Sequence, residues 1–268
     1  MKKIVAVLTA VLISAAAVRA QEAKSEHGTP PPPAAPAVTE PATKDWKVEV
    51  GADYCSEYIF RGVDVSHNNP LAQDHLLVGY KGFTATYYGY YSPVDVPGLG
   101  WYTEHDYTLD YTITLKKFTI TAGALYYQYP NGRSGVDTWD LYTVAAYDFP
   151  LLNPKATLNW DVDEFGTGYG TVGISHVFDL TKTVGLKDPM TLSITPSAAL
   201  GIDFGYNSKK TQSNIDWNDV LLGVSVNLGI TKNVSVHAGV QCSIALNSLS
   251  NINQGDEVIG NVGVAVAF

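Results

Sequence analysis

The sequence predicts an all-β fold, namely a transmembrane antiparallel up-and-down β-barrel of about 12 strands. Apolar and polar residues alternate with period 2 from Trp46 to Phe268, which is the pattern of strands with two different faces. The alternating segments run for about 10–15 residues, whereas strands of soluble proteins most often have about 5–6. No segment after the N-terminal region holds the roughly 18 or more apolar residues that a transmembrane helix needs, which leaves a closed barrel as the means of crossing a membrane.

The clearest alternation lies in residues 103–115, where Tyr107, Leu109 and Tyr111 alternate with Asp106 and Asp110. Tight, lysine-bearing turns such as 81–82 and 116–117 alternate with longer polar loops, as in barrels with short periplasmic turns and long extracellular loops. We expect strands near residues 46–61, 71–80, 83–92, 102–115, 118–129, 137–148, 155–163, 169–178, 190–204, 217–228, 233–246 and 257–268.

A soluble β-sandwich also alternates, with its apolar face inward. The polar face here consists largely of small and polar residues, which suits the lumen of a barrel. Aromatic residues gather near the expected strand ends, as in the girdles at membrane interfaces. The candidates for these girdles are Trp46, Tyr58, Phe60, Trp101, Tyr102, Trp139 and Trp217. Together these features favour the membrane barrel.

The N-terminus predicts export. Lys2 and Lys3 precede an uncharged run from Ile4 to Val18, and small residues lead to Ala20. This is the pattern of a secretory signal peptide over residues 1–20, with cleavage near Ala20. Residues 21–45 form a Pro-rich segment without the large apolar groups of a core, and we expect a disordered leader. This leader is either a flexible connection or a spacer that touches the cell wall or a partner.

Charge and cysteine content exclude several classes of partner. Residues 1–20 contain three of the 17 basic residues and none of the 26 acidic ones, so residues 21–268 carry a net charge of −12. This acidity argues against nucleic acid as a partner. Cys55 and Cys242 fall on opposite faces of the expected strands, and we expect both to be free. Residues 161–166 resemble the start of a calcium loop but lack its later ligands, so we expect neither a metal nor a cofactor.

Three segments resemble parts of known outer-membrane proteins. Phe268 follows the alternating Val264 and Val266, and this end resembles the C-terminal signal that the outer-membrane barrel assembly machinery reads. The run from Ser56 to Ser66, with Tyr58-Ile59-Phe60-Arg61-Gly62, then Pro70 and Gln73, resembles the first hairpin of the TorF-type porin family. Residues 82–95 are similar to the second hairpin of that family, although Tyr90 and Tyr91-Ser92-Pro93 depart from it. The resemblance implies a barrel in the bacterial outer membrane, with pore activity.

If the apolar side chains face lipid, the opposite parity faces the lumen. Acids outnumber bases in this set, so a conducting lumen should prefer cations. Arg61 is either a constriction residue or a base that neutralises neighbouring acids and pins a loop. The expected pore-lining residues are Glu49, Asp53, Glu57, Arg61, Gln73, Glu104, Asp106, Asp110, Asp140, Asp161, Asp163 and Asp203.

The predicted function is that of a porin in outer-membrane lipid with a narrow, cation-preferring pore for small solutes or ions. Twelve strands lie between the eight that just fill their interior and the 16–18 that leave a wide channel. The alternative is a non-conducting structural or adhesive barrel tethered by its leader. No Gly-x-Ser-x-Gly or His-Glu-x-x-His motif is present, and we expect no enzyme activity. The sequence leaves the oligomeric state open, and a homo-oligomer is compatible with it.

Overall fold

The structure is a computed structural model that describes residues 46–96, 100–131, 135–207 and 215–268. The predicted signal peptide (residues 1–20) and the Pro-rich leader (residues 21–45) lie outside the described residues. Within the described ranges, no helix is long and apolar enough to cross a membrane.

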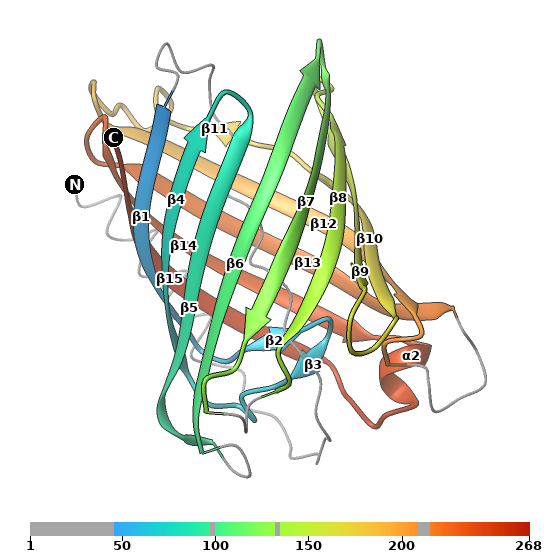
Figure 1. Cartoon of the computed structure of the whole chain (residues 1–268). Helices are drawn as coiled ribbons and strands as arrows, with labels where there is room; N and C mark the ends of the chain where they lie inside the picture. The colour runs from blue at the N-terminus through green and yellow to red at the C-terminus, as the bar shows by residue number, and fades with distance from the viewer. Residues whose placement is uncertain (1–45, 97–99, 132–134, 208–214) are drawn as a thin grey trace.

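Twelve long strands of the described chain form one closed antiparallel sheet (Figure 1). Consecutive strands pair with one another, and the last strand pairs with the first, so the topology is up-and-down as predicted. The twelve strands are β1 (Trp46–Cys55), β4 (Leu71–Tyr80), β5 (Phe83–Val96), β6 (Gly100–Leu115), β7 (Phe118–Gln128), β8 (Thr138–Tyr147), β9 (Asn153–Asp161), β10 (Gly168–Ser175), β12 (Thr191–Phe204), β13 (Asp216–Gly229), β14 (Val234–Ala245) and β15 (Glu257–Ala267).

Three short elements complete the described fold. β11 (Phe178–Asp179) continues the pairing of β10 along β12. β2 (Ile59–Phe60) and β3 (Val63–Asp64) form a small separate hairpin, and α2 (Asn247–Ser250) lies in the connection between β14 and β15. We name the two ends of the barrel by their connections. The turn end carries the turns at 81–82 and 116–117, and the loop end carries the hairpin and α2.

The barrel closes where its first and last strands pair. β1 and β15 pair from Glu49 opposite Ala267 to Cys55 opposite Asn261. The backbone N–H of Phe268 donates to the carbonyl oxygen of Val48 at 2.9 Å. The even number of strands brings the two ends of the sheet together, and no edge is left unpaired.

The two faces of the wall differ as the alternation predicts. Leu109 and Leu115 on the outer face of β6 are 61% and 62% exposed, whereas Glu104 and Asp106 on the inner face are fully buried. A row of outward aromatic rings crosses β5 to β8, with centroid distances of 5.5, 6.4 and 4.7 Å between successive members. This row consists of Tyr87, Tyr107, Tyr126 and Trp139. An apolar outer band with aromatic rings is typical of a barrel that faces lipid.

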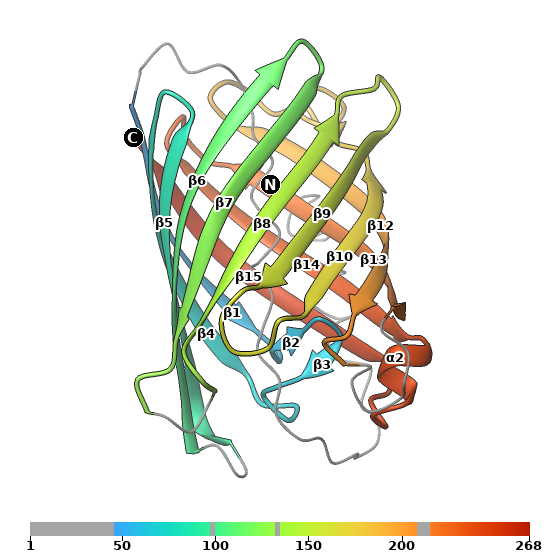
Figure 2. The ribbon, with the colours of Figure 1, turned by 45° about the vertical axis from the view of Figure 1, so that its right-hand side comes forward.

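The first strand is shorter than predicted. β1 ends at Cys55 rather than near residue 61, and the chain then turns into the barrel as the β2–β3 hairpin (Figures 1 and 2). Tyr58 and Phe60, which we expected in an interface girdle, are therefore buried inside, and so is Tyr102. β5 and β6 extend further toward the loop end than predicted, to Val96 and from Gly100.

Candidate functional site: the lumen and its inner hairpin

Residues 56–66 form an inner hairpin that lies between the walls of the barrel at the loop end (Figure 2). Ile59 pairs with Asp64 and Phe60 with Val63, which leaves Arg61 and Gly62 as a two-residue turn. Both turn residues have positive φ, +50° and +83°. This is the backbone of a type I′ turn, in which glycine is favoured because it has no Cβ.

The inner hairpin fills this half of the lumen with packed side chains. Tyr58 stacks on Tyr90 with centroids 4.9 Å apart and meets Tyr102 edge to face at 5.8 Å. Phe60 meets Tyr127 edge to face at 6.2 Å. These rings belong to one buried apolar cluster that joins the hairpin to β4, β5, β6 and β7. The loop-end half of the barrel thus contains a packed core of buried apolar side chains, as the interior of a soluble protein does.

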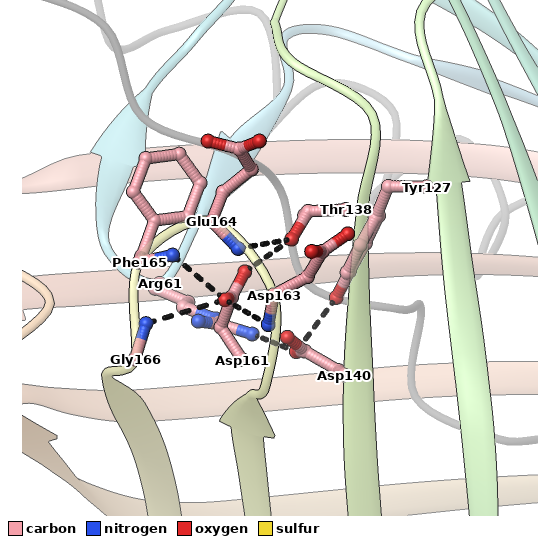
Figure 3. A network of polar contacts seen from close by, with 9 residues as sticks. All are labelled: Arg61, Tyr127, Thr138, Asp140, Asp161, Asp163, Glu164, Phe165 and Gly166. Atoms are coloured by element: carbon pink, nitrogen blue, oxygen red, sulfur yellow. Dashed lines mark hydrogen bonds and ion pairs between the residues drawn. The ribbon is translucent and has the colours of Figure 1, made fainter.

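The tip of the hairpin is fixed to the far walls of the barrel. The Nη2 atom of Arg61 lies 2.5 Å from Oδ2 of Asp140 on β8 (Figure 3). The carbonyl oxygen of Arg61 accepts a hydrogen bond of 2.7 Å from the side-chain amide of Asn218 on β13. A Cβ on Gly62 would collide with Leu249 of α2. Arg61 therefore neutralises an acid and pins the loop, which is one of the two roles that the sequence left open.

A β-bulge supplies one of these anchors. Leu200 pairs with Val220 and Ile202 pairs with Trp217, so Asn218 and Asp219 both stand opposite Gly201. Both side chains are fully buried, and a Cβ on Gly201 would collide with the Asp219 carboxylate. A bulge places two successive side chains on the same side of a strand. Simple alternation could not have found this pair.

The predicted acids near the hairpin are buried and have specific partners. Asp140 also accepts a hydrogen bond of 3.2 Å from Tyr127. Asp161 accepts from Thr138 at 2.6 Å and from the backbone amides of residues 163, 165 and 166 (Figure 3), so it organises the β9–β10 loop. Asp203 accepts from Ser248 at 2.7 Å. These carboxylates build the loop end.

Two further acids lie beneath the hairpin. Glu104 and Asp106 are fully buried, and the hydroxyl of Tyr102 donates to Glu104. Gln73 on β4 is also buried on this inner face. The prediction that Asp163 lies on a strand was wrong, because β9 ends at Asp161 and Asp163 lies in the exposed loop that follows.

Burial inside the barrel changes the pKa of titratable side chains on the hairpin. Burial raises the pKa of Glu57 to about 8, and the nearby Glu257 and Asp64 add to the effect. Burial likewise raises the pKa of Asp64. Burial acts to lower the pKa of Arg61, but Tyr127 and Asp140 raise it, so the guanidinium stays charged. The hairpin therefore carries one firm positive charge and two carboxyl groups whose pKa is raised above the ordinary value.

The half of the lumen nearer the turn end does not contain the inner hairpin, and we call it the open half. Lys47 on β1 and Lys155 on β9 face inward near the turn end, Gln241 faces inward from the middle of β14, and all three side chains are exposed. Asp53 binds His237 at 2.6 Å, and Asp110 accepts from Tyr142 at 2.7 Å.

A second acid–histidine pair lines the same half. The carboxylate of Glu49 lies 3.5 Å from Nε2 of His75 and 3.2 Å from Nζ of Lys47. The sequence placed Glu49 and Asp53 among the expected pore-lining residues and His237 on the lumenal face of its strand, but it did not pair either acid with a histidine. His75 and His237 share the lumenal parity of their strands, and that parity is the signal that could have found both pairs. No three His, Cys, Asp or Glu residues of the described chain are grouped as a metal site, and both cysteines are free.

No family model matches the chain, and no curated protein matches it. Solved structures do match. The NanC porin has a TM-score of 0.51 at 12% identity, with 82% of this chain and 98% of that chain covered. The KdgM porin has a TM-score of 0.50 at 13% identity, with 83% and 99% covered. At such identities the likeness concerns the fold alone. The chain is therefore a closed, 12-stranded antiparallel transmembrane β-barrel, and its fold is similar to that of these two porins.

Proposed function

We propose that this protein is an outer-membrane channel for small solutes, with a narrow, cation-preferring path that the inner hairpin constricts. The observation that carries the proposal is the contrast between the two halves of the lumen. The open half is lined by exposed polar side chains such as Lys47 and Gln241, and the loop-end half is occupied by a hairpin of the chain itself. An inward-folded segment at one end of a polar barrel is suited to limiting what passes.

The proposed cation preference rests on the charges of the lumen. The described part of the open half contains more acids than lysines. The acids are Glu49, Asp53 and Asp110, and the lysines are Lys47 and Lys155. Near the hairpin, Asp140, Asp161, Asp203 and Asp219 are buried with one guanidinium, that of Arg61. Carboxylates in a confined space of low dielectric attract cations and repel anions.

The proposal includes the location and assembly of the protein. The barrel fold and the predicted signal peptide support the bacterial outer membrane, with the turn end periplasmic and the loop end extracellular. The exposed Phe268 at the end of β15 supports recognition by the barrel assembly machinery. A homo-oligomer that packs through the apolar outer face is compatible with this proposal.

The test is planar-bilayer conductance of the refolded protein, with the reversal potential measured in a salt gradient. We expect discrete conductance steps and a reversal potential on the cation side, which falls at high salt because screening shortens to about 3 Å at 1 M. Asp53→Asn should shift the reversal potential toward zero. Asp74→Asn is the matched control, because Asp74 lies on the outer face of the adjacent strand, where Ala52 is its partner. A conducting protein that prefers anions would refute the cation preference.

We keep a non-conducting structural barrel as the second candidate, because packed side chains occupy the loop end. The same experiment separates the two when it is repeated with a variant in which a short Gly-Ser linker replaces residues 57–65. A channel constricted by the hairpin should conduct more in the variant than in the wild type. If both proteins are folded and neither conducts, the structural barrel takes the place of the channel.

A further inference from the structure

The surroundings of Arg61 form a complete recognition site for a guanidinium group. Its side chain is almost fully buried. Besides the 2.5 Å ion pair with Asp140, the guanidinium carbon lies 4.6 Å from the ring centroid of Tyr206 and 5.9 Å from that of Tyr169. One carboxylate for hydrogen bonding and aromatic faces for stacking are the features by which proteins select guanidinium over other cations.

The site also holds the backbone beside the side chain. Asn218 donates 2.7 Å to the carbonyl oxygen of Arg61, and Asn207 donates to the same oxygen at 3.5 Å. Asn207 in turn donates to the side-chain oxygen of Asn218 at 2.9 Å, which orients the two amides. The wall thus contacts both a guanidinium and a carbonyl group, the two ends of an arginine-like molecule.

The ring of Phe60, 4.6 Å from the guanidinium carbon, belongs to the hairpin, whereas the other contacts come from outside it. Asp140 lies on β8, Tyr169 on β10, Tyr206 after β12 and Asn218 on β13. Most of the site therefore belongs to the barrel wall and its loops, although the ring of Tyr206 also meets that of Phe60 edge to face at 5.8 Å. We call Asp140, Tyr127, Tyr169, Tyr206, Asn207 and Asn218 the guanidinium cage.

Arg61 supplies the counter-charge of Asp140 in the cage, but it does not use all of its own hydrogen-bond donors. Removal of Arg61 would leave the carboxylate of Asp140 buried without a counter-charge, which is costly. Three further buried carboxylates, Asp161, Asp203 and Asp219, surround this region. Yet the buried Nε atom of Arg61 has no hydrogen-bond partner. A tethered arginine at a turn with positive φ cannot use all of its donors here, whereas a free molecule is not constrained in this way.

We propose that the guanidinium cage is a binding site for small solutes that carry a guanidinium group, and that Arg61 is its internal occupant. Such a solute competes with Arg61, and its binding displaces the inner hairpin from the lumen. The inference rests on the proposed channel function, because it names the class of solute that releases the constriction. Arg61 thereby couples the occupancy of the cage to the width of the path.

The test measures binding of L-arginine to the refolded Arg61→Ala protein by isothermal titration calorimetry. L-Citrulline is the matched probe, since a neutral urea group replaces the guanidinium. L-Lysine separates guanidinium from a simple positive charge. We expect arginine to bind at least about tenfold more tightly than either probe, because citrulline lacks the charge that pairs with Asp140 and lysine lacks the planar guanidinium that stacks on the tyrosine rings. The wild type should bind arginine more weakly than Arg61→Ala, because Arg61 competes.

Two double variants locate the site. Adding Asp140→Asn to Arg61→Ala should abolish the preference for arginine. Adding Asp110→Asn should not, because Asp110 faces the lumen outside the cage and binds Tyr142. Equal binding of arginine and citrulline, or an unchanged preference in the Asp140→Asn double variant, would overturn the inference.

A measurement on the wild type covers the case in which Arg61→Ala does not fold. Hydrogen exchange of the backbone amides of residues 57–66 should speed up with arginine and remain unchanged with citrulline. No difference between the two probes would also overturn the inference. Neither experiment depends on conductance. If arginine binds to a barrel that does not conduct, the channel fails and the cage stands, and if the barrel conducts without preference for arginine, the cage fails alone.

Discussion

Arg61 and Asp140 are 79 positions apart in the sequence, and their side chains form an ion pair of 2.5 Å inside the barrel. The Asp140 side chain is 1% exposed and that of Arg61 is 2% exposed. Water therefore screens this pair very little. The pair joins the tip of the inner hairpin to β8, so one charge on the wall is among the anchors that hold the hairpin.

Asp140→Asn should release the hairpin. Breaking a buried ion pair by removing one partner costs about 3–5 kcal/mol, because the other charge stays buried without compensation. We expect a lower urea midpoint and a larger single-channel conductance. Asp163→Asn is the control, since Asp163 lies in an exposed loop, and such surface changes stay within about 0.5 kcal/mol. Equal effects of the two substitutions would show that the pair does not hold the hairpin.

Gly62→Ala should weaken the docking of the hairpin for two reasons. The φ of Gly62 is +83°, and its new Cβ would collide with Leu249 of α2. A left-handed conformation costs an alanine about 1–2 kcal/mol, and overpacking typically adds about 1–3 kcal/mol. Gly185→Ala separates the two causes, because Gly185 has a φ of +72° and open space around it. Urea unfolding in detergent should show a larger loss for Gly62→Ala, and a loss no greater than that of Gly185→Ala would mean that Leu249 moves aside.

The barrel itself could be predicted from the sequence. The alternation predicted all twelve long strands. It does so because each strand of such a barrel has one face toward lipid and one toward the lumen. The inner hairpin escaped prediction because Tyr58 and Phe60 continue the period-2 pattern of β1. A strand in a barrel wall and a hairpin inside it both bury alternate apolar residues. The Arg61-Gly62 step, with glycine in the second position of a two-residue turn, was the one local sign of a reversal.

The candidate site was predicted only in part for a related reason. Asp140 and Arg61 were both expected in the lumen, but nothing local in the sequence pairs residues so far apart. Asn218 and Asp219 were not expected, because one of two successive residues in a regular strand faces outward. The bulge opposite Gly201 turns both inward. Such a bulge depends on the packing between two strands and leaves no clear trace in the pattern of either one.

Glu57 should make the docking of the hairpin sensitive to pH. Its pKa is raised from 4.5 to about 8, chiefly by burial, and by Glu257 and Asp64 beside it. A carboxyl with a raised pKa binds a proton more tightly in the folded state than in the unfolded state. Its favourable contribution is therefore complete below about pH 4.5 and is lost as the pH rises toward 8.

The measurement is the urea midpoint of the wild type and of Glu57→Gln at several values between pH 4.5 and 8.5. The wild type should lose stability relative to the variant as the pH rises, because glutamine stays neutral throughout. Comparison with the variant removes the contributions of the other titrating groups. Parallel curves for the two proteins would show that Glu57 does not control the docking.

The last prediction tests which face of the wall meets lipid. Val240 and Gln241 are neighbours in the middle of β14, opposite Val224 and Gly223 of β13. Val240 shares the apolar outer face with Val224, and Gln241 faces the open half of the lumen. An arginine on the lipid face at the bilayer midplane costs about 2–4 kcal/mol, so Val240→Arg should lower the unfolding midpoint in lipid vesicles.

Gln241→Arg should cost much less, because its exposed side chain already meets the lumen and Gly223 leaves room across the strand pair. The two variants carry the same new charge one position apart, so each serves as the control for the other. Gln241→Arg should also move the reversal potential toward anions, because it adds a positive charge to the path, and Val240→Arg should leave the potential of its folded fraction unchanged. A greater loss of stability in Gln241→Arg would reverse the assigned faces, and with them the location of every acid on which the proposed channel depends.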